Sequence, residues 1–167
     1  MGGESPCNHG PRLAITIGVG EHSVEDLVAY QFAVRFKSDV YRLIRLSPVA
    51  QRDFKYRAQI EDALGGIDSN IAEGFGRHRA TEFANFLLYA LGSIAEAKAR
   101  LQDGILRGHF FAEDCVTAFA WAGRCRQVTE RLRKSQLRLI ERDRRDSPGQ
   151  RRRPRPDDGK PRRPRRP

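Results

Sequence analysis

Apolar residues recur at three- and four-residue steps along most of the chain from residue 24 to residue 142. No alternating pattern of useful length occurs in that range, and the run Leu13–Val19 is the only strand candidate. Because an α-helix repeats every 3.6 residues, this pattern predicts an all-α fold. We expect four helices, at Val24 or Glu25 to Leu46, Ala50 to Glu73, Thr81 to Arg107, and Glu113 to Arg142.

Residues that start or stop helices lie at the ends of these segments. Ser23 is a suitable N-cap for the first segment, and Pro48 is expected to end it. Gly74 and Gly76 are expected to stop the second segment, and Gly108 to cap the end of the third.

A pair of glycines, Gly65 and Gly66, lies in the middle of the second segment. Each is expected to cost a helix about 1 kcal/mol relative to alanine. Two explanations stay open at this point. Either the helix is interrupted at the pair, or a neighbouring helix approaches so closely that no side chain fits.

The short connections between the four segments favour an up-down-up-down antiparallel four-helix bundle. The apolar face of the first segment spans an arc of roughly 200°, whereas a surface helix needs about 100°. Four helices alone would leave part of such faces uncovered, so we expect the protein to self-associate. The bundle is expected to span residues 23–145, with a disordered N-terminal extension at 1–22 and a disordered tail at 146–167.

Positive charge is concentrated at the C-terminus. The chain has a formal net charge of +10, and residues 148–167 alone hold nine basic and two acidic residues, a balance of +7. The other 147 residues hold 22 basic and 19 acidic residues, a balance of only +3. The last twenty residues are mostly arginine and proline, with no aliphatic or aromatic side chain, which predicts disorder with polyproline II character.

Three groups of arginines are candidates for binding the phosphates of RNA or DNA. Arg77 and Arg79 lie in the turn before the third helix, where the free N–H groups of a helix start favour an anion. Arg138 and Arg142 lie near the end of the fourth helix, where the helix dipole alone would favour cations. A solvated basic loop and a solubilising tail are the simpler alternatives. The candidate arginines of the tail are Arg151, Arg152, Arg153, Arg155, Arg162 and Arg163.

The block Asn70–Arg77 joins the second and third segments through a glycine-rich turn. Asn70 and Glu73 are polar groups beside an apolar stretch, so they either hold a ligand or fasten the junction. We expect the structural role, with Asn70 bonded to the backbone and Glu73 paired with an arginine, because buried polar groups are usually satisfied locally. Gly74 and Gly76 belong to the same structural junction.

The sequence contains no arrangement of residues that predicts catalysis. The four histidines lie in expected loops or termini, and no nucleophile stands at a readable spacing from them. The three cysteines are widely spaced and lack a metal-ligand pattern. We therefore expect no enzyme activity, no cofactor and no metal. Since no apolar run has the length of a membrane span and no signal-peptide pattern is present, we expect a cytoplasmic protein.

Six short motifs occur in an order and spacing that match a known family. They are Asp26-Leu27, Tyr30-Gln31-x-Ala33, Val40-Tyr41, Asn70-Ile71-Ala72-Glu73-Gly74, Glu82-Phe83-x-x-Phe86-Leu87 and Ala90-Leu91-Gly92-Ser93-x-x-Glu96. The chain thereby resembles the bacterial 23S rRNA intervening-sequence proteins, also called the S23 ribosomal protein family. The likeness covers roughly residues 25–135. The Asn70–Gly74 block and the Ala90–Ser93 block are its most specific parts.

The resemblance implies a four-helix bundle that assembles as a homopentamer around a central channel. It also implies a fold similar to the accessory protein that partners reverse transcriptase in diversity-generating retroelements. One departure concerns Asp68, which replaces a proline, and Glu61 or Asp62, which replaces a basic residue. These changes weaken an anion-binding role for that surface.

Two functions follow as hypotheses. The first is a non-enzymatic oligomeric bundle that binds RNA or DNA through its basic loops and its Arg/Pro tail. The second is a protein-interaction scaffold or an accessory subunit of a partner such as a reverse transcriptase.

Overall fold

The all-α prediction is confirmed, because helices form nearly all of the chain that the structure describes. This structure is a computed structural model that describes residues 23–146, and no strand occurs within that range. The predictions for residues 1–22 and 147–167, including the Leu13–Val19 strand candidate, lie outside the described residues. The elements are η1 (Val24–Asp26), α1 (Val28–Leu46), α2 (Pro48–Arg52), α3 (Phe54–Gly76), α4 (Ala80–Leu106), η2 (Glu113–Cys115) and α5 (Val116–Asp146).

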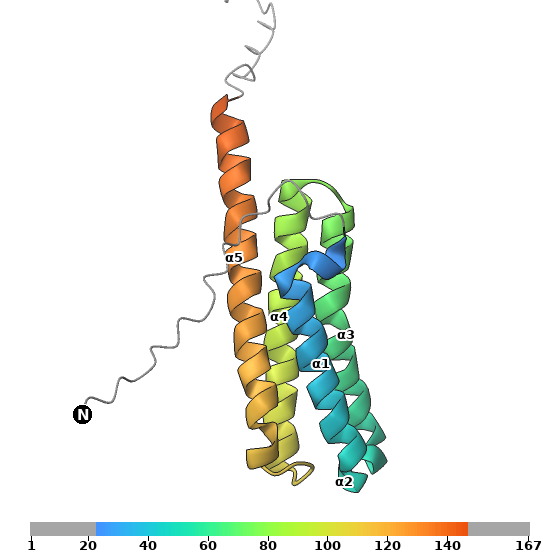
Figure 1. The fold of residues 1–167 in the computed structure, drawn as a ribbon. Coiled ribbons are helices and arrows are strands. Elements are labelled where there is room, and N and C mark those ends of the chain that lie inside the picture. The colour runs from blue at the N-terminus through green and yellow to red at the C-terminus, as the bar shows by residue number, and fades with distance from the viewer. Residues whose placement is uncertain (1–22, 147–167) are drawn as a thin grey trace, which may run out of the picture.

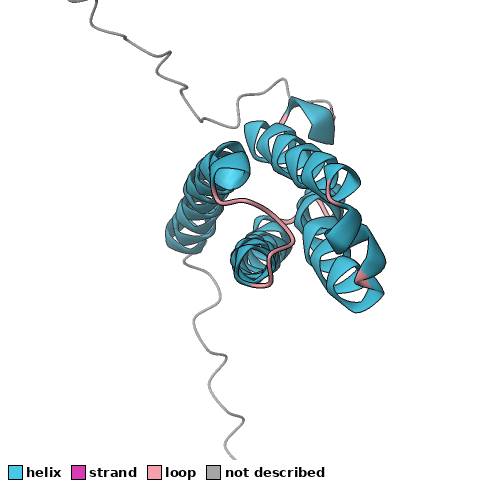
Figure 2. Cartoon of the chain, turned by 90° about the horizontal axis from the view of Figure 1, so that it is seen from below, coloured by secondary structure: helices cyan, strands magenta, loops and turns pink. Residues whose placement is uncertain are grey.

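The four long helices, α1, α3, α4 and α5, lie side by side around one core (Figures 1 and 2). Contacts join α1 to α3, α3 to α4, α4 to α5 and α5 back to α1, so each long helix has two neighbours. Figure 1 shows that consecutive long helices run in opposite directions, and that the short α2 lies at the lower end of the molecule.

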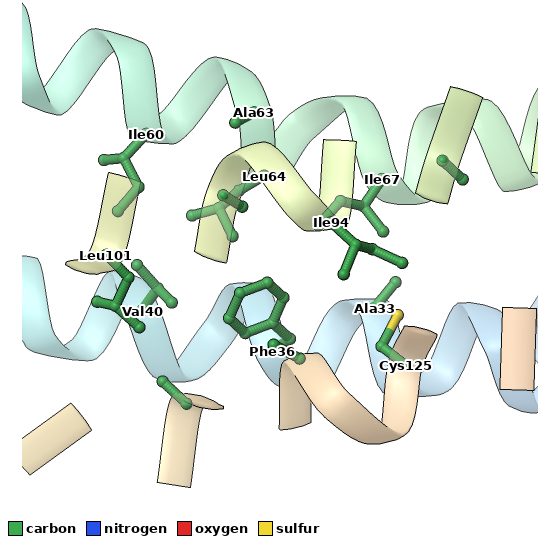
Figure 3. Close-up of a cluster of buried hydrophobic side chains, with 14 of the residues drawn as sticks. Ala33, Phe36, Val40, Ile60, Ala63, Leu64, Ile67, Ile94, Leu101 and Cys125 are labelled. Carbon is green, nitrogen blue, oxygen red and sulfur yellow. The ribbon is translucent and has the colours of Figure 1, made fainter. Parts of the chain in front are cut away.

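Each long helix contributes an apolar stripe to the core. Phe36 of α1 is fully buried and shares the core with Leu64 of α3, Ile94 of α4 and Cys125 of α5 (Figure 3). Full burial of a side chain of this kind contributes about 1.5–3 kcal/mol to folding. The helical spacing of apolar residues in the sequence therefore identifies the faces that meet in the core.

The first long helix begins later than the sequence predicts. Ser23 caps only the single turn of η1, where its hydroxyl accepts a hydrogen bond from the Glu25 backbone N–H (3.3 Å). The backbone is then extended at Leu27, whose buried side chain turns into the core, and α1 starts one residue later. At the other end α1 stops at Leu46, and Pro48 takes the first position of α2, where its missing N–H would have had no helical partner.

The predicted second helix is divided at Asp53 into the short α2 and the long α3. The Ser47 hydroxyl caps α2 by accepting from the Ala50 N–H (3.1 Å), and the Asp53 carboxylate caps α3 by accepting from the Tyr56 N–H (3.0 Å). Each side chain satisfies a backbone donor that a helix start leaves without a partner. This break was missed because two polar capping side chains make it, and the spacing of apolar residues does not report capping.

The glycine pair in α3 does not interrupt the helix. A Cβ atom at Gly66 would lie 2.7 Å from the Ser93 Oγ atom of α4, whereas a Cβ atom at Gly65 would meet nothing within 4 Å. Of the two explanations left open, close approach of a neighbouring helix therefore holds for Gly66.

Gly74 lies inside α3, so the prediction that it stops the helix was wrong. A Cβ atom at Gly74 would lie 2.6 Å from the Phe86 Cβ atom, because α4 packs closely against α3 at this point. The helix continues to Gly76, and Arg77 is its C-cap. Left-handed backbone first occurs at His78 (φ 54°), which makes the turn.

The remaining helix ends differ from the predicted ones by a few residues. The last helical residue of α4 is Leu106, and Gly108 follows in the left-handed conformation (φ 74°) that suits a glycine. Residues Glu113–Cys115 form the separate turn η2, so α5 starts at Val116. It continues to Asp146, beyond the predicted end at Arg142.

Candidate nucleic-acid interface

The Asn70–Gly76 junction is held by bonds within α3. The Asn70 side-chain amide donates a hydrogen bond to the Gly66 carbonyl (2.5 Å), and the Glu73 carboxylate pairs with Arg77 (2.6 Å). Both polar groups thus have partners one helical turn away. The arrangement fastens the end of α3 and offers no converging set of groups for a ligand.

The two arginines of the α3–α4 turn each have a carboxylate partner. Arg77 pairs with Glu73, and its guanidinium lies over the Phe86 ring, 5.6 Å from the ring centroid. The hydrogen bond and charge of Glu73 raise the pKa of Arg77 above its ordinary value. Arg79 lies 3.6 Å from a carboxylate oxygen of Glu82. The turn therefore carries little net positive charge, although both arginines are exposed.

Asp68, which replaces the proline expected from the resemblance, pairs with Lys37 across the α1–α3 contact (2.7 Å). The side chains are only 26 % and 15 % exposed, so each charge is partly removed from water. The second carboxylate oxygen of Asp68 is buried without a partner among the described residues. Asp68 therefore serves to join two helices.

Positive charge in the described part of the chain belongs to α5. This helix carries nine basic and four acidic residues, whereas residues 23–115 carry 12 basic and 13 acidic residues. Within α5, one ion pair is formed among the described residues, between Arg126 and Glu130 (2.9 Å). Most of its basic side chains consequently face water without a carboxylate partner.

Four of these residues form a line along one face of α5, at intervals of seven residues. Seven residues fall only about 20° short of two full helical turns, so side chains at this interval point the same way. All four are exposed, and none lies in an ion pair among the described residues. They span about 31 Å along the helix axis. We call Arg124, Arg131, Arg138 and Arg145 the arginine stripe.

The upper part of α5 projects beyond the other helices (Figure 1). Arg133 donates a hydrogen bond to the Ala84 carbonyl (3.2 Å), which sets this level of α5 beside the first turns of α4. The last buried residue of α5 is Gln136, and residues 137–146 follow it. Arg138, Arg142 and Arg145 are therefore on a helical arm that leads into the Arg/Pro segment.

An aromatic cluster lies beside the lower end of the stripe, where α5 contacts α1. The rings of Phe32 and Trp121 lie 5.7 Å apart between centroids. Two guanidinium groups lie over the Trp121 ring, that of Arg35 at 5.3 Å and that of Arg124 at 5.0 Å. Both arginines are exposed. The cluster thus combines a half-buried indole with two cations.

The lower end of the molecule, opposite the projecting arm of α5, carries an apolar surface (Figure 1). Leu46, Val49 and Phe111 are 70 %, 54 % and 74 % exposed, and they line a pocket of about 320 Å³ between the α1–α2 corner and the loop before η2. His109 also lines this pocket and is itself buried. Its Nε2 atom lies 3.4 Å from the Asp53 carboxylate.

Groups with catalytic potential are few in residues 23–146. No group of three potential metal-ligating side chains occurs there, and none of its helices is long and apolar enough to cross a membrane. Cys115 and Cys125 are buried free thiols. Burial raises the pKa of Cys115 to about 11 and that of Cys125 to about 12, so both stay protonated near neutral pH.

Residues 25–116 match the family described as 23S rRNA-intervening sequence protein, and this segment is more than half of the chain. The chain belongs to the 23S rRNA-intervening sequence protein family. The resemblance seen in the motifs is thereby confirmed, although the match ends at residue 116 and the motifs had indicated about residue 135. No curated protein matches the chain.

In this member of the 23S rRNA-intervening sequence protein family, the matched segment ends at the residue where the basic helix α5 begins. The matched segment therefore contains the nearly neutral helices α1 to α4. The arginine stripe, Trp121 and the projecting arm all lie after it. The basic surface therefore lies outside the matched segment.

The structure brings together only some of the predicted nucleic-acid-binding residues. Arg138 and Arg142 lie on the α5 arm. Arg77 and Arg79 lie in the α3–α4 turn, and each has a carboxylate partner. The tail arginines from Arg151 onward are outside the described residues. Sequence reasoning missed Arg35, Trp121, Arg124 and Arg145 as candidates. The seven-residue arginine spacing was a readable signal for two of them. The pairing of Arg35 with Trp121 depends on the packing of α1 against α5.

Proposed function

We propose that this protein is a non-enzymatic, oligomeric helical-bundle protein that binds RNA or DNA along α5 and the Arg/Pro segment that follows it. The arginine stripe is the observation that carries this proposal. Exposed arginines without carboxylate partners are free to neutralise phosphates, and a line of them about 31 Å long matches an extended polyanion better than a small ligand. The paired Arg77 and Arg79 contribute less, because a phosphate would have to compete with Glu73 and Glu82.

The proposed assembly unit is the up-down-up-down antiparallel bundle, and the proposed assembly is the homopentamer that the family resemblance implies. A groove of about 810 Å³ between α4 and α5 supports association. Small residues such as Gly92, Ala95 and Gly123 line it, together with the exposed Leu88. Several copies would place several α5 arms in one particle, which multiplies their electrostatic attraction for nucleic acid. The proposed compartment is the cytoplasm.

The experiment compares the full chain with a chain that ends at Asp146, by fluorescence anisotropy of a labelled oligonucleotide at increasing salt. Binding by the full chain should fall steeply with salt, because phosphate contacts release counterions. Removal of the Arg/Pro segment should weaken binding and flatten this dependence. Equal binding by both chains would remove the segment from the proposal, and no binding by the full chain at low salt would overturn the proposal itself.

A second candidate function, an accessory subunit of a protein partner such as a reverse transcriptase, is favoured by the apolar surface of Leu46, Val49 and Phe111. Exposed apolar side chains around a pocket are typical of protein-interaction sites. If this function holds, a Phe111→Ser variant should lose co-elution with the partner enzyme in gel filtration and keep its affinity for nucleic acid. Unchanged co-elution would exclude this surface.

A further inference from the structure

Trp121 differs from the other aromatic residues that contact arginine in the described chain. Its ring has two guanidinium neighbours, those of Arg35 and Arg124, and neither arginine lies in an ion pair among the described residues. Phe32 shares Arg35 with Trp121 (5.8 Å to the Phe32 centroid), and at the two rings outside this cluster a single arginine covers the ring and is itself paired with a carboxylate. This holds for Arg57, which covers Phe54 and lies 3.7 Å from Glu61, and for Arg77, which covers Phe86 and pairs with Glu73.

The chemistry of this cluster suits a ligand that presents a flat ring and a phosphate together. Indole rings stack on nucleobases of any sequence, and arginine guanidinium groups bind phosphates. Arg35 and Arg124 are exposed, so their contacts with the ring are weak in water. An arriving base can therefore replace one guanidinium on the ring, and the displaced group can then bind the phosphate beside that base.

The cluster lies at the lower end of the arginine stripe. Arg124 belongs to both, and Trp121 precedes it by less than one helical turn on α5. A strand whose phosphates follow the stripe would thus bring a base to the level of Trp121. In a duplex every base is paired and stacked within the helix, so only an unpaired base can reach the indole without melting the duplex.

We propose that Trp121, flanked by Arg35 and Arg124, stacks on an unpaired base and thereby makes α5 a binding surface for single-stranded nucleic acid. This inference rests on the proposed nucleic-acid function and specifies its substrate class. Trp121 supplies the stacking surface. Arg35 and Arg124 hold the flanking phosphates.

The first test uses the fluorescence of the unmodified protein, because Trp121 is the only tryptophan of the chain. The full chain is titrated with a single-stranded oligonucleotide, as RNA and as DNA, with the corresponding duplex, and with inorganic polyphosphate. Quenching by either single strand, with little change for duplex and polyphosphate at equal saturation, is the expected result. Equal quenching by polyphosphate, or none by the single strands although anisotropy shows that they bind, would overturn the inference. Absence of any binding would overturn the proposed function first.

The second test compares Trp121→Leu with the matched control Phe54→Leu, which removes an exposed aromatic ring from another arginine contact. Loss of one stacked base should weaken single-strand binding at least about fivefold. Duplex binding by the same variant, and both affinities of the control, should stay unchanged. An equal loss for single strand and duplex would mean that Trp121 only clamps α5 to α1. If Trp121→Leu does not fold, Trp121→Phe replaces it in the comparison. This variant keeps an aromatic ring, so it should lose less affinity for the single strand. The fluorescence test needs no variant.

Discussion

The close contact between α3 and α4 predicts opposite effects for two alanine substitutions in the same helix. Gly74→Ala would place a Cβ atom 2.6 Å from the Phe86 Cβ atom and 2.8 Å from the Phe83 Cδ2 atom. Both neighbours are packed side chains of α4, so the new methyl group forces the helices apart. Gly65→Ala would meet nothing within 4 Å, which makes it the matched control.

The expected magnitudes follow from two opposing effects. Overpacking a core contact costs typically 1–3 kcal/mol, and replacing a helical glycine by alanine returns about 1 kcal/mol. Gly74→Ala should therefore lower the free energy of unfolding by about 1 kcal/mol, and by about 2 kcal/mol at most. Gly65→Ala should raise it by about 0.5–1 kcal/mol, since only the helix-propensity gain applies. The two variants should differ by about 2 kcal/mol.

Urea unfolding followed by circular dichroism measures both variants at one protein concentration, which keeps any self-association equal. The slope of free energy against urea should match that of the original chain, so that the midpoints report stability. Stabilisation by Gly74→Ala to the same degree as by Gly65→Ala would contradict the close contact at Gly74. That result would mean that α4 does not approach α3 as closely as described.

Two further predictions concern helix capping and the buried thiols. Asp53→Ala should lower the free energy of unfolding by about 1 kcal/mol, because the Tyr56 N–H loses its acceptor. Asp53→Asn should lower it less, since asparagine also caps helices. Equal losses for the two variants in urea unfolding would contradict the capping role. Burial raises the pKa of Cys115 to about 11 and that of Cys125 to about 12, so the thiols of the unfolded chain ionise at lower pH than those of the folded chain. The free energy of unfolding should therefore be unaffected below pH 9 and should fall as the pH rises towards 12. Cys125→Ala should make this fall shallower in unfolding measured against pH, and an unchanged profile would contradict it.

Local patterns in the sequence predict much of this fold, and contacts between distant segments account for what they miss. The three- and four-residue spacing reveals the four long helices because it reports which faces are buried. It does not reveal the break at Asp53, because a polar capping side chain makes this break and the apolar spacing does not report capping. Nor does it distinguish Gly65 from Gly74, because that difference depends on where the side chains of α4 fall.

The candidate site was less predictable than the fold, for a related reason. Arg77 and Arg79 look like free cations in the sequence, but helical geometry brings Glu73 and Glu82 within reach of them. The cation cluster at Trp121 needs the α1–α5 contact, which no local pattern encodes. The stripe on α5 needs only a regular helix, so its seven-residue spacing was available from the sequence alone.

Binding of nucleic acid along the arginine stripe is tested most directly by the dependence of this binding on salt. A variant with all four stripe residues changed to glutamine is compared with the original chain and with a control in which Arg77 and Arg79 are changed instead. With a single-stranded ligand, loss of four phosphate contacts should reduce the slope of log K against log salt by about 3. The control should change the slope much less, because its arginines already have carboxylate partners. An unchanged slope in the stripe variant, with a flattened slope in the control, would contradict the account.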